Sequence, residues 1–379
     1  QLISKGQVLA AHPIALGGIA AAISKMSFGN KIGLVFAEGF DTSKLFTPDY
    51  GALILEIDRQ DDPAALFPGV AYERLGTTTG QPVITVGAVQ ISLEQAITAW
   101  EAPLDEVFPL KKDLPGDPEP IFYSSGKRGK AKCKIAKPRV LMPIFPGTNG
   151  EYELEKAFCQ AGGSVDPFVF KNSSGDTIKE AMTIMAQKIK ASQIIALPGG
   201  FSAGAEPAGA GKFIATVFRN LGLAEQVMDL LNNRDGLILG IGDGFHALLR
   251  LGLVPDGEIR PLAENSPALV GNPLGRHVSR LVQTKVVSNL SPWFSNVEVG
   301  AIFALPVSSS EGRFVATPSI LQKMIKQGQI ATQYVDFDGV PSYDGNFNPF
   351  VAQASIEGIT SPDGRVLGKM AHSERIGHG

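Results

Sequence analysis

The sequence contains few cysteines and no long run of apolar residues. Only Cys133 and Cys159 are cysteines among its 379 residues. Two thiols cannot build the disulfide framework of a small secreted protein, and they fit a protein of the reducing cytosol. No apolar run reaches the roughly 20 residues that a membrane-spanning helix needs, which excludes a helical membrane protein. We therefore expect a cytoplasmic protein that has no membrane partner.

Positive charge and metal-binding patterns are also scarce. The formal net charge is −3, and charged residues make up 19% of the chain, so there is no general basic field for nucleic acid. The five histidines and two cysteines show no spacing typical of zinc ligands, and no Walker-type Gly-Lys-Ser/Thr follows an apolar run. We expect no metal site, no nucleic-acid partner, and binding to small anions or other protein surfaces.

The length and apolar content of the chain indicate more than one domain. With 379 residues and 44% hydrophobic residues, it can bury large cores, and two or three domains are expected. The sequence begins at Gln1 without a Met and has no signal-peptide pattern. We therefore expect a fragment of a longer protein.

Residues 235–251 contain the most informative pattern in the chain. An apolar run meets Gly240, Gly242 and Gly244, after which Phe245, Leu248, Leu249 and Leu251 recur at helical spacing. This pattern predicts a buried strand, a tight turn and a helix. Enzymes use such an elbow to hold a nucleophile in an exposed, strained position. Here the residue at the tip is Gly242, which has no side chain to react.

The elbow belongs to a longer alternation of strands and helices between residues 137 and 379. Strands are expected at 139–145, 167–170 and 193–197, and helices at 151–161, 177–190 and 211–219. Such alternation predicts an α/β domain with a doubly wound, mostly parallel sheet, in which ligands bind at the carboxyl ends of the strands. The glycine turns at 146–149, 198–202 and 242–244 should converge there.

The first 110 residues have a different pattern. We expect a helix from Gly17, strands at 33–37 and 52–57, a hairpin at 83–91 and a helix capped by Ser92, which is an α+β layout.

A linker is expected at 111–136, where Pro, Gly and Lys cluster. Its basic run at 127–134 is a solvated connector or, alternatively, contacts a phosphate or an acidic domain. Cys133 lies in this linker and is not expected to be a nucleophile.

The elbow resembles that of the class I glutamine amidotransferase domain of phosphoribosylformylglycinamidine synthase, an enzyme of purine synthesis. The family elbow reads Gly-Ile-Cys-Asn-Gly-Phe-Gln, so Gly242 replaces the Cys, Asp243 the Asn and His246 the Gln. The resemblance implies a flavodoxin-like fold.

The same resemblance assigns the site residues. It implies an oxyanion and glutamine-binding turn at Gly199, Gly200, Phe201 and Ser202, next to Asp243. It also implies that His372 and Glu374 are the remaining members of a Cys-His-Glu triad, whose thiolate would attack glutamine. The glutaminase site is therefore expected to be inactive. Further departures from the family pattern lie at Ala205, Ala208, Ser309 and Ser310.

Residues 1–110 also resemble a part of that synthase. The part is the C-terminal half of its second domain of the aminoimidazole ribotide synthetase type. His12, Gly17 and Gly18 are kept from its His-Asp-x-Ser-x-Gly-Gly pattern, whereas Pro13 and Ala15 replace the Asp and Ser. The resemblance implies ATP and Mg as cofactors of the full-length family enzyme, with none in this fragment. It also implies that upstream synthetase domains of the same protein are its partners. Whether glutamine is a further partner is left open.

Three interpretations follow. The chain is the C-terminal part of a phosphoribosylformylglycinamidine synthase with an inactive glutaminase site, or a non-catalytic module that docks on a synthetase core. A third interpretation retains the same fold but assigns another small ligand to the crevice between the glycine turns. Among the remaining candidates, Cys159 is expected in the packed core, and His12 and His246 are expected to be structural. His277 is either structural or part of the glutamine pocket.

Overall fold

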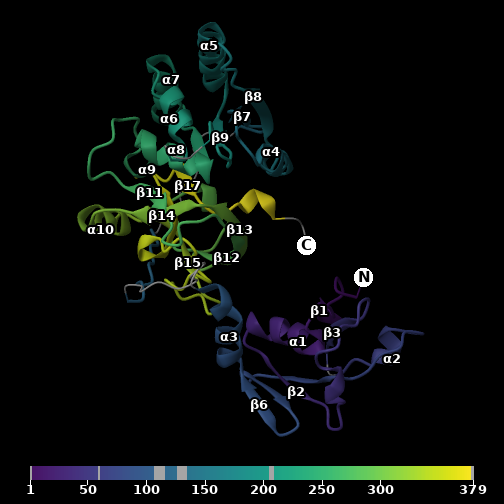
Figure 1. Ribbon diagram of the computed structural model, residues 1–379. Coiled ribbons are helices and arrows are strands. Elements are labelled where there is room, and N and C mark those ends of the chain that lie inside the picture. The colour runs from purple at the N-terminus through teal and green to yellow at the C-terminus, as the bar shows by residue number, and fades with distance from the viewer. Residues whose placement is uncertain (1, 59, 106–115, 126–134, 205–208, 377–379) are drawn as a thin grey trace. The chain divides into compact units, whose positions relative to one another are not determined.

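The computed structural model describes residues 2–58, 60–105, 116–125, 135–204 and 209–376. The chain folds into two compact units, Gln1–Leu110 and Lys111–Gly379 (Figure 1). Several residues singled out by the sequence lie outside the described residues, namely the basic run at 127–134 with Cys133, and Ala205 and Ala208.

The first unit contains a four-stranded sheet in the order β4-β2-β5-β6 and a separate pair, β1-β3. Its described elements are β1 (Val8–Pro13), α1 (Gly18–Phe28), β2 (Gly33–Phe36), β3 (Leu53–Ile57), α2 (Pro63–Leu66), β4 (Gly76–Thr79), β5 (Val83–Val86), β6 (Val89–Ser92) and α3 (Leu93–Asp105). The strands, the hairpin and both longer helices expected from the sequence are confirmed to within a few residues. Its core gathers residues of α1, β2 and β5 such as Ile23, Leu34 and Ile84.

The second unit is larger and begins with an ordered part of the predicted linker. Residues 116–125 pack on the rest of the unit. The Tyr123 backbone N–H donates to the Val287 carbonyl at 2.8 Å, and the Ile121 N–H donates to Oε1 of Gln333 at 2.9 Å. These two hydrogen bonds tie the segment to β15 and to the residue that follows β12.

In the second unit the strands are β7 (Arg139–Ile144), β8 (Ser164–Val169), β9 (Ile194–Leu197), β10 (Leu237–Ile241), β11 (Ala268–Gly271), β12 (Val278–Val286), β13 (Ile302–Ser309), β14 (Glu311–Val315), β15 (Ile330–Val335), β16 (Ile356–Thr360) and β17 (Val366–Lys369). The α-helices are α4 (Glu151–Gln160), α5 (Gly175–Ala191), α6 (Lys212–Phe218), α7 (Leu221–Asn232), α8 (Asp243–Leu251), α9 (Leu253–Asp256) and α10 (Pro318–Lys326). Four short 3-10 helices, η1 (Thr42–Lys44) in the first unit and η2 (Pro292–Phe294), η3 (Gln353–Ser355) and η4 (Ser373–Arg375) in the second, complete the described elements.

Among the described residues, nine strands of the second unit form one mixed sheet in the order β13-β12-β15-β16-β17-β10-β9-β7-β8. The pairings from β8 to β17 are parallel, and β7, β8 and β9 lie side by side in Figure 1. The pairings from β17 to β13 are antiparallel. The predicted mostly parallel sheet is therefore correct for only half of this sheet. Short connections such as the turn between β16 and β17 leave no room for a crossover helix, so those strands run antiparallel.

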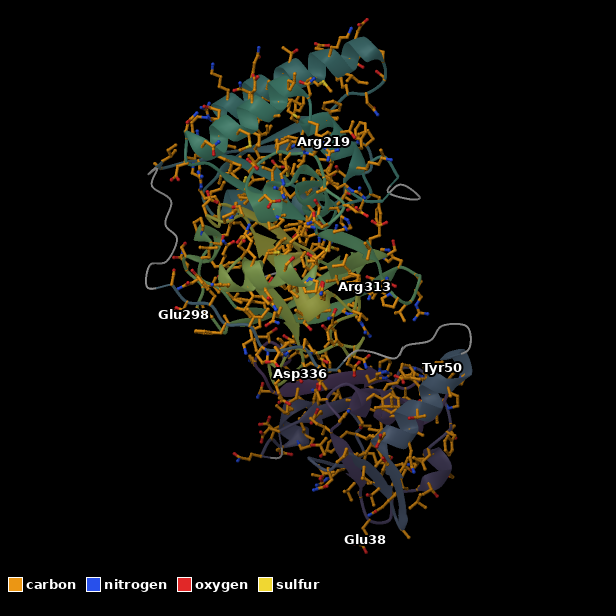
Figure 2. The ribbon with its side chains drawn as sticks, turned by 90° about the vertical axis from the view of Figure 1, so that its left-hand side faces the viewer. Glu38, Tyr50, Arg219, Glu298, Arg313 and Asp336 are labelled. Atoms are coloured by element: carbon orange, nitrogen blue, oxygen red, sulfur yellow. The ribbon has the colours of Figure 1, made fainter. Side chains whose placement is uncertain are left out.

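Helices cover both faces of this sheet. On β7, Leu141 joins a cluster that includes Met185 of α5 and Val227 of α7, whereas Val140 and Met142 on the opposite face pack in a cluster with Leu154 of α4. Burial also alternates in the small β11-β14 sheet, where Phe314 is buried and its neighbour Arg313 is exposed. Figure 2 labels Arg313. The α/β layering predicted from the alternating pattern is confirmed.

The sequence pattern did not reveal every element. Helix α7 and the strands after the elbow were not predicted, although the elements from β7 to β10 lie close to their predicted positions. Within the described ranges, no helix is long and apolar enough to cross a membrane.

Candidate functional site

The predicted elbow is present, with Gly242 between β10 and α8. Gly242 has φ 53° and ψ −109°, a conformation that side chains disfavour. A Cβ on Gly244 would clash with the Leu197 carbonyl oxygen, and one on Gly240 would lie 2.7 Å from the Gly244 carbonyl carbon. The outer two glycines therefore let the strand and the helix approach each other closely.

At Gly242 itself a side chain would fit. An ideal Cβ there would lie 3.7 Å from the Cα of Gly199 and 3.8 Å from Nε2 of His372, both ordinary van der Waals distances. The elbow thus combines a sharp backbone bend with free space for a side chain. Only the side chain is missing.

His372 is oriented by Glu374, as the predicted pair requires. Nδ1 of His372 lies 2.7 Å from Oε1 of Glu374, so the imidazole donates its Nδ1–H to the carboxylate and leaves Nε2 facing Gly242. Both side chains are buried. The His372 backbone N–H donates to the Pro306 carbonyl at 2.8 Å, which ties η4 to β13. This is the arrangement of a general base held by a carboxylate.

A buried ion pair supports the segment that leads to His372. Nζ of Lys369 lies 3.7 Å from Oε1 of Glu357, and both side chains are almost fully buried. The same carboxylate accepts the backbone N–H of Ala371 at 2.7 Å, and Lys369 donates to the Ala371 carbonyl at 3.0 Å. The Lys369 carbonyl accepts the Gly242 N–H at 2.9 Å. Lys369 thereby links the elbow to His372.

Sequence reasoning missed this ion pair. Its only signal is one charged residue in each of two short, mostly apolar strands, Glu357 in β16 and Lys369 at the end of β17. Such charges must be paired when they are buried.

The predicted oxyanion turn lies beside the imidazole. A Cβ on Gly199 would lie 2.7 Å from Cε1 of His372, so only glycine allows this approach. Two N–H groups of the turn already have protein acceptors, because Phe201 donates to the Gly147 carbonyl at 2.8 Å and Ser202 donates to Oδ2 of Asp243 at 3.0 Å. Gly200, with φ 136°, also lines the crevice.

Asp243 is a structural clamp in this geometry. Its side chain is buried, and Oδ1 accepts the Gly211 N–H at 2.5 Å while Oδ2 accepts the Ser202 N–H. Burial raises the pKa of this carboxyl, and the hydrogen bonds from Ser202 and Gly211 oppose that rise. Since both oxygens hold backbone groups, Asp243 joins the glycine turn to the start of α6.

His246 is buried in the wall of the same crevice. Burial lowers its pKa to about 4, so the imidazole is neutral at neutral pH. The ring has a hydrogen bond to the backbone of Glu311, whose Oε2 accepts the Ala210 N–H at 2.9 Å. Nε2 of His246 is buried and has no hydrogen-bond partner among the described residues.

These groups enclose a small crevice. Its cavity volume is about 20 Å³, which is room for about one water molecule. His277 stands next to this wall, because its Nε2 lies 2.9 Å from Oγ of Ser308 and its ring centroid lies 6.0 Å from that of Phe201. The crevice is lined by Gly200, Phe201, Ala210, Gly242, Asp243, His246, Ser308, Ser309, Ser310, Glu311 and His372.

Two other candidates lie elsewhere. The prediction that Cys159 is packed in the core is wrong, because Cys159 is exposed. Helix α4 turns Leu154 and Phe158 toward the sheet, and the next position falls about 100° further around the helix. His12 lies in β1 of the first unit, where Nδ1 donates to the Pro13 carbonyl at 2.7 Å. In the described part of the chain, no three His, Cys, Asp or Glu residues are grouped to hold a metal ion.

Comparison with known families gives this geometry its context. Residues 137–379 match the profile of the CobB/CobQ-like glutamine amidotransferase domain. The chain belongs to this family. As an amidotransferase homologue, it is also similar to the PurQ subunit of phosphoribosylformylglycinamidine synthase, an enzyme of purine biosynthesis.

The PurQ subunit of Methanococcus maripaludis is 31% identical over 244 residues, which cover 63% of this chain and 82% of the relative. The PurQ subunit of Dehalococcoides mccartyi is 30% identical over 251 residues, covering 65% and 88%.

A second kind of relative matches nearly the whole chain. The probable phosphoribosylformylglycinamidine synthase of Arabidopsis thaliana, chloroplastic or mitochondrial, is 28% identical over 410 residues, covering 99% of this chain and 28% of the relative. Among solved structures, PurLQS from Thermotoga maritima aligns with a TM-score of 0.45 at 23% identity, covering 63% of this chain and 89% of that chain.

Proposed function

We propose that this chain is part of a phosphoribosylformylglycinamidine synthase whose amidotransferase domain no longer hydrolyses glutamine. The observation that carries the proposal is the geometry at Gly242. The elbow, the oriented imidazole and the space for a side chain are all present. Nε2 of His372 lies 3.8 Å from an ideal Cβ on Gly242, but glycine has no sulfur atom at this position.

The chemistry explains why this loss is decisive. In a class I amidotransferase a thiolate attacks the carboxamide carbon, forms a thioester and releases ammonia, while the imidazole moves the proton. Without the thiol, His372 has no nucleophile to deprotonate. Asp243, its nearest acidic neighbour on the elbow, holds two backbone N–H groups instead.

Cys159 does not replace the missing group. It is exposed, and it stands nine residues after Gly150, the N-cap of α4, which lies beside Glu374 and Arg375. At 1.5 Å per helical residue this separation is about 13 Å.

The cofactors and partners of the parent enzyme belong to the same proposal. Its ATP and Mg would be bound by synthetase domains, on which this amidotransferase domain would dock. The first unit would be similar to aminoimidazole ribotide synthetase, as supported by the match of nearly the whole chain to the Arabidopsis relative. Among the described residues of the first unit, no three His, Cys, Asp or Glu side chains gather in a group that could hold a metal ion by themselves.

A second candidate function is a non-catalytic module that shapes the synthetase core. The buried Lys369 and Glu357 pair favours it, because this costly network still holds the elbow and η4 in place although no nucleophile is present.

A glutaminase assay tests the loss of catalysis. We expect no ammonia release above background from the natural chain, and release from Gly242→Cys that disappears in Gly242→Cys combined with His372→Ala. Cys133→Ser with Cys159→Ser is the matched control, which removes the natural thiols. Turnover by that control protein that is lost with His372→Ala would overturn the proposal.

Calorimetry with glutamine then tests whether the domain still binds this ligand. Binding without ammonia release favours the non-catalytic module, whereas no binding favours a purely structural domain.

A further inference from the structure

A second cavity lies outside the carboxyl ends of β7 and β8, at one edge of the nine-stranded sheet. Its volume is about 300 Å³, at the lower end of the range of about 300–1,000 Å³ for small-molecule pockets. This edge groove is lined by residues 144–146 and 169–173. Its lining shares no described residue with the crevice at Gly242, so it is a separate site.

The inner part of the edge groove is apolar. Phe145 and Phe170 form its floor, each only 2% exposed, and their ring centroids lie 5.2 Å apart. Along the walls, Ile144 is half-buried, Pro146 is exposed and Val169 is 61% exposed. These three side chains leave apolar surface in water, and covering such surface with an apolar ligand is favourable by about 25 cal/mol per Å².

The outer part of the edge groove offers hydrogen-bond donors and positive charge. Lys171, Asn172 and Ser173 are all exposed there. Within the described ranges, neither the ammonium of Lys171 nor the side-chain amide of Asn172 has a hydrogen-bond or ion-pair partner. Both groups are therefore free to donate to a ligand.

The acidic residues nearest to Lys171 along the chain have lysine partners of their own. Asp166 pairs with Lys188 at 2.6 Å. Asp176 lies 4.0 Å from Lys179, and both of these side chains are exposed. Lys171 is thus left to attract an anion. A carboxylate accepts charge-assisted hydrogen bonds from an ammonium and can also accept one from an amide.

The sheet edge beside the groove is poorly suited to an added strand. Strand β8 is the last strand of the sheet, and it contains Pro167. Proline has no N–H for strand pairing, and it protects edge strands against pairing with another chain. The occupant is therefore a small molecule rather than an extended peptide.

We propose that the edge groove binds a small carboxylate with an apolar body, such as an aryl or branched-chain carboxylic acid. The apolar body would cover Ile144, Pro146 and Val169, and the carboxylate would accept hydrogen bonds from Lys171 and Asn172. This proposal goes beyond the proposed function, and it does not depend on whether the elbow hydrolyses glutamine.

The test uses the full chain at pH 7 and three probes that share one fluorinated ring. They are 4-fluorophenylacetate, 4-fluorophenylacetamide and 4-fluorobenzylammonium, which carry a negative, a neutral and a positive group. Titration of each probe, followed by its ¹⁹F NMR line width, gives a dissociation constant. We expect saturable binding of the carboxylate, binding of the amide that is about tenfold weaker, and no saturable binding of the cation.

Two variants locate the bound probe. Lys171→Met should weaken carboxylate binding about tenfold and remove the preference for the carboxylate over the amide. Val169→Asp places a like charge on the apolar wall and should abolish carboxylate binding. Both side chains are exposed, so the fold tolerates the changes. Lys179→Met is the matched control, because this exposed lysine of α5 lies outside the groove and its loss should change nothing.

Three results would overturn the proposal. They are the absence of saturable carboxylate binding, equal dissociation constants for the carboxylate and the amide, and carboxylate binding that neither Lys171→Met nor Val169→Asp weakens. The glutaminase assay uses the crevice at Gly242 and not the edge groove, so each proposal can fail by itself.

Discussion

Nε2 of His372 faces the position that a side chain at Gly242 would occupy, 3.8 Å from an ideal Cβ on that glycine. On its other side the imidazole is fixed by Glu374 at 2.7 Å. In the proposed function this is the relationship of a base to a nucleophile position at which the residue has only hydrogen in place of a side chain. The residues that hold this geometry can each be tested by substitution.

Substitution of Gly242 by alanine should destabilise the second unit. The space is sufficient, but φ 53° with ψ −109° disfavours any Cβ, and residues held in such regions cost about 1–3 kcal/mol. Urea unfolding measures the free energy. Gly271→Ala is the control, because its Cβ would meet nothing within 4 Å and its φ is not positive. Equal stability of the two variants would contradict the strained elbow conformation of Gly242.

Substitution of Gly199 by alanine should displace the imidazole of His372. Its Cβ would lie 2.7 Å from Cε1 of that ring, and such overpacking costs about 1–3 kcal/mol. In a Gly242→Cys background, the added alanine should also slow alkylation of the introduced thiol by a glutamine-like reagent, because the base is moved away. Gly175→Ala, where the Cβ meets open space, should leave the alkylation rate unchanged. An unaffected rate in the Gly199 variant would show that His372 does not activate the thiol.

The buried imidazole of His246 should make stability depend on pH. Its pKa is about 4 in the folded chain, against an ordinary value of 6.5. The unfolded chain therefore binds more protons between these pH values, and the stabilisation present above pH 6.5 is lost as pH falls toward 4. The linkage corresponds to about 3 kcal/mol as an order of magnitude.

Unfolding free energies measured between neutral and mildly acidic pH test this linkage. His246→Gln should flatten the slope, whereas His277→Gln, at an exposed position, should retain it. The same slope in both variants would assign the pH dependence to other groups.

The Lys369 and Glu357 pair should show strong coupling. Removal of one partner leaves the other charge buried, so Lys369→Met should cost about 3–5 kcal/mol. Adding Glu357→Gln should recover part of that loss, because the unpaired charge is then removed as well. A double-mutant cycle by urea unfolding measures the coupling, and simple additivity would contradict it. Lys179→Met, at an exposed i,i+3 pair with Asp176, should change stability little.

Local sequence patterns were enough for the elements whose signals lie within a few residues. The spacing of Gly240, Gly242 and Gly244 between an apolar run and a helical face predicted the elbow, and the alternation from 139 to 219 predicted strands β7 to β9 with their helices. These patterns succeed because strand and helix periodicity are properties of neighbouring residues. The resemblance also placed His372 and Glu374 as a pair before any distance was known.

Distant contacts were decided by the tertiary structure. Whether Cys159 is buried depends on which face of α4 meets the sheet, and a single sequence pattern did not show this. The antiparallel half of the sheet depends on how β12, β13, β15 and β16 return to β17, which is a matter of long-range pairing.

The sequence by itself determined that a glycine stands at the tip of the elbow, because the absence of a side chain is a local chemical fact. Only the fold decided that this glycine keeps a nucleophile's backbone bend opposite an oriented imidazole. The fold also decided that the imidazole of His246 is buried in the wall of the same crevice. Gly242 and His246 both belong to the elbow and the start of α8, whereas His372 comes from a distant part of the chain, and the pairing of β10 with β17 brings them together.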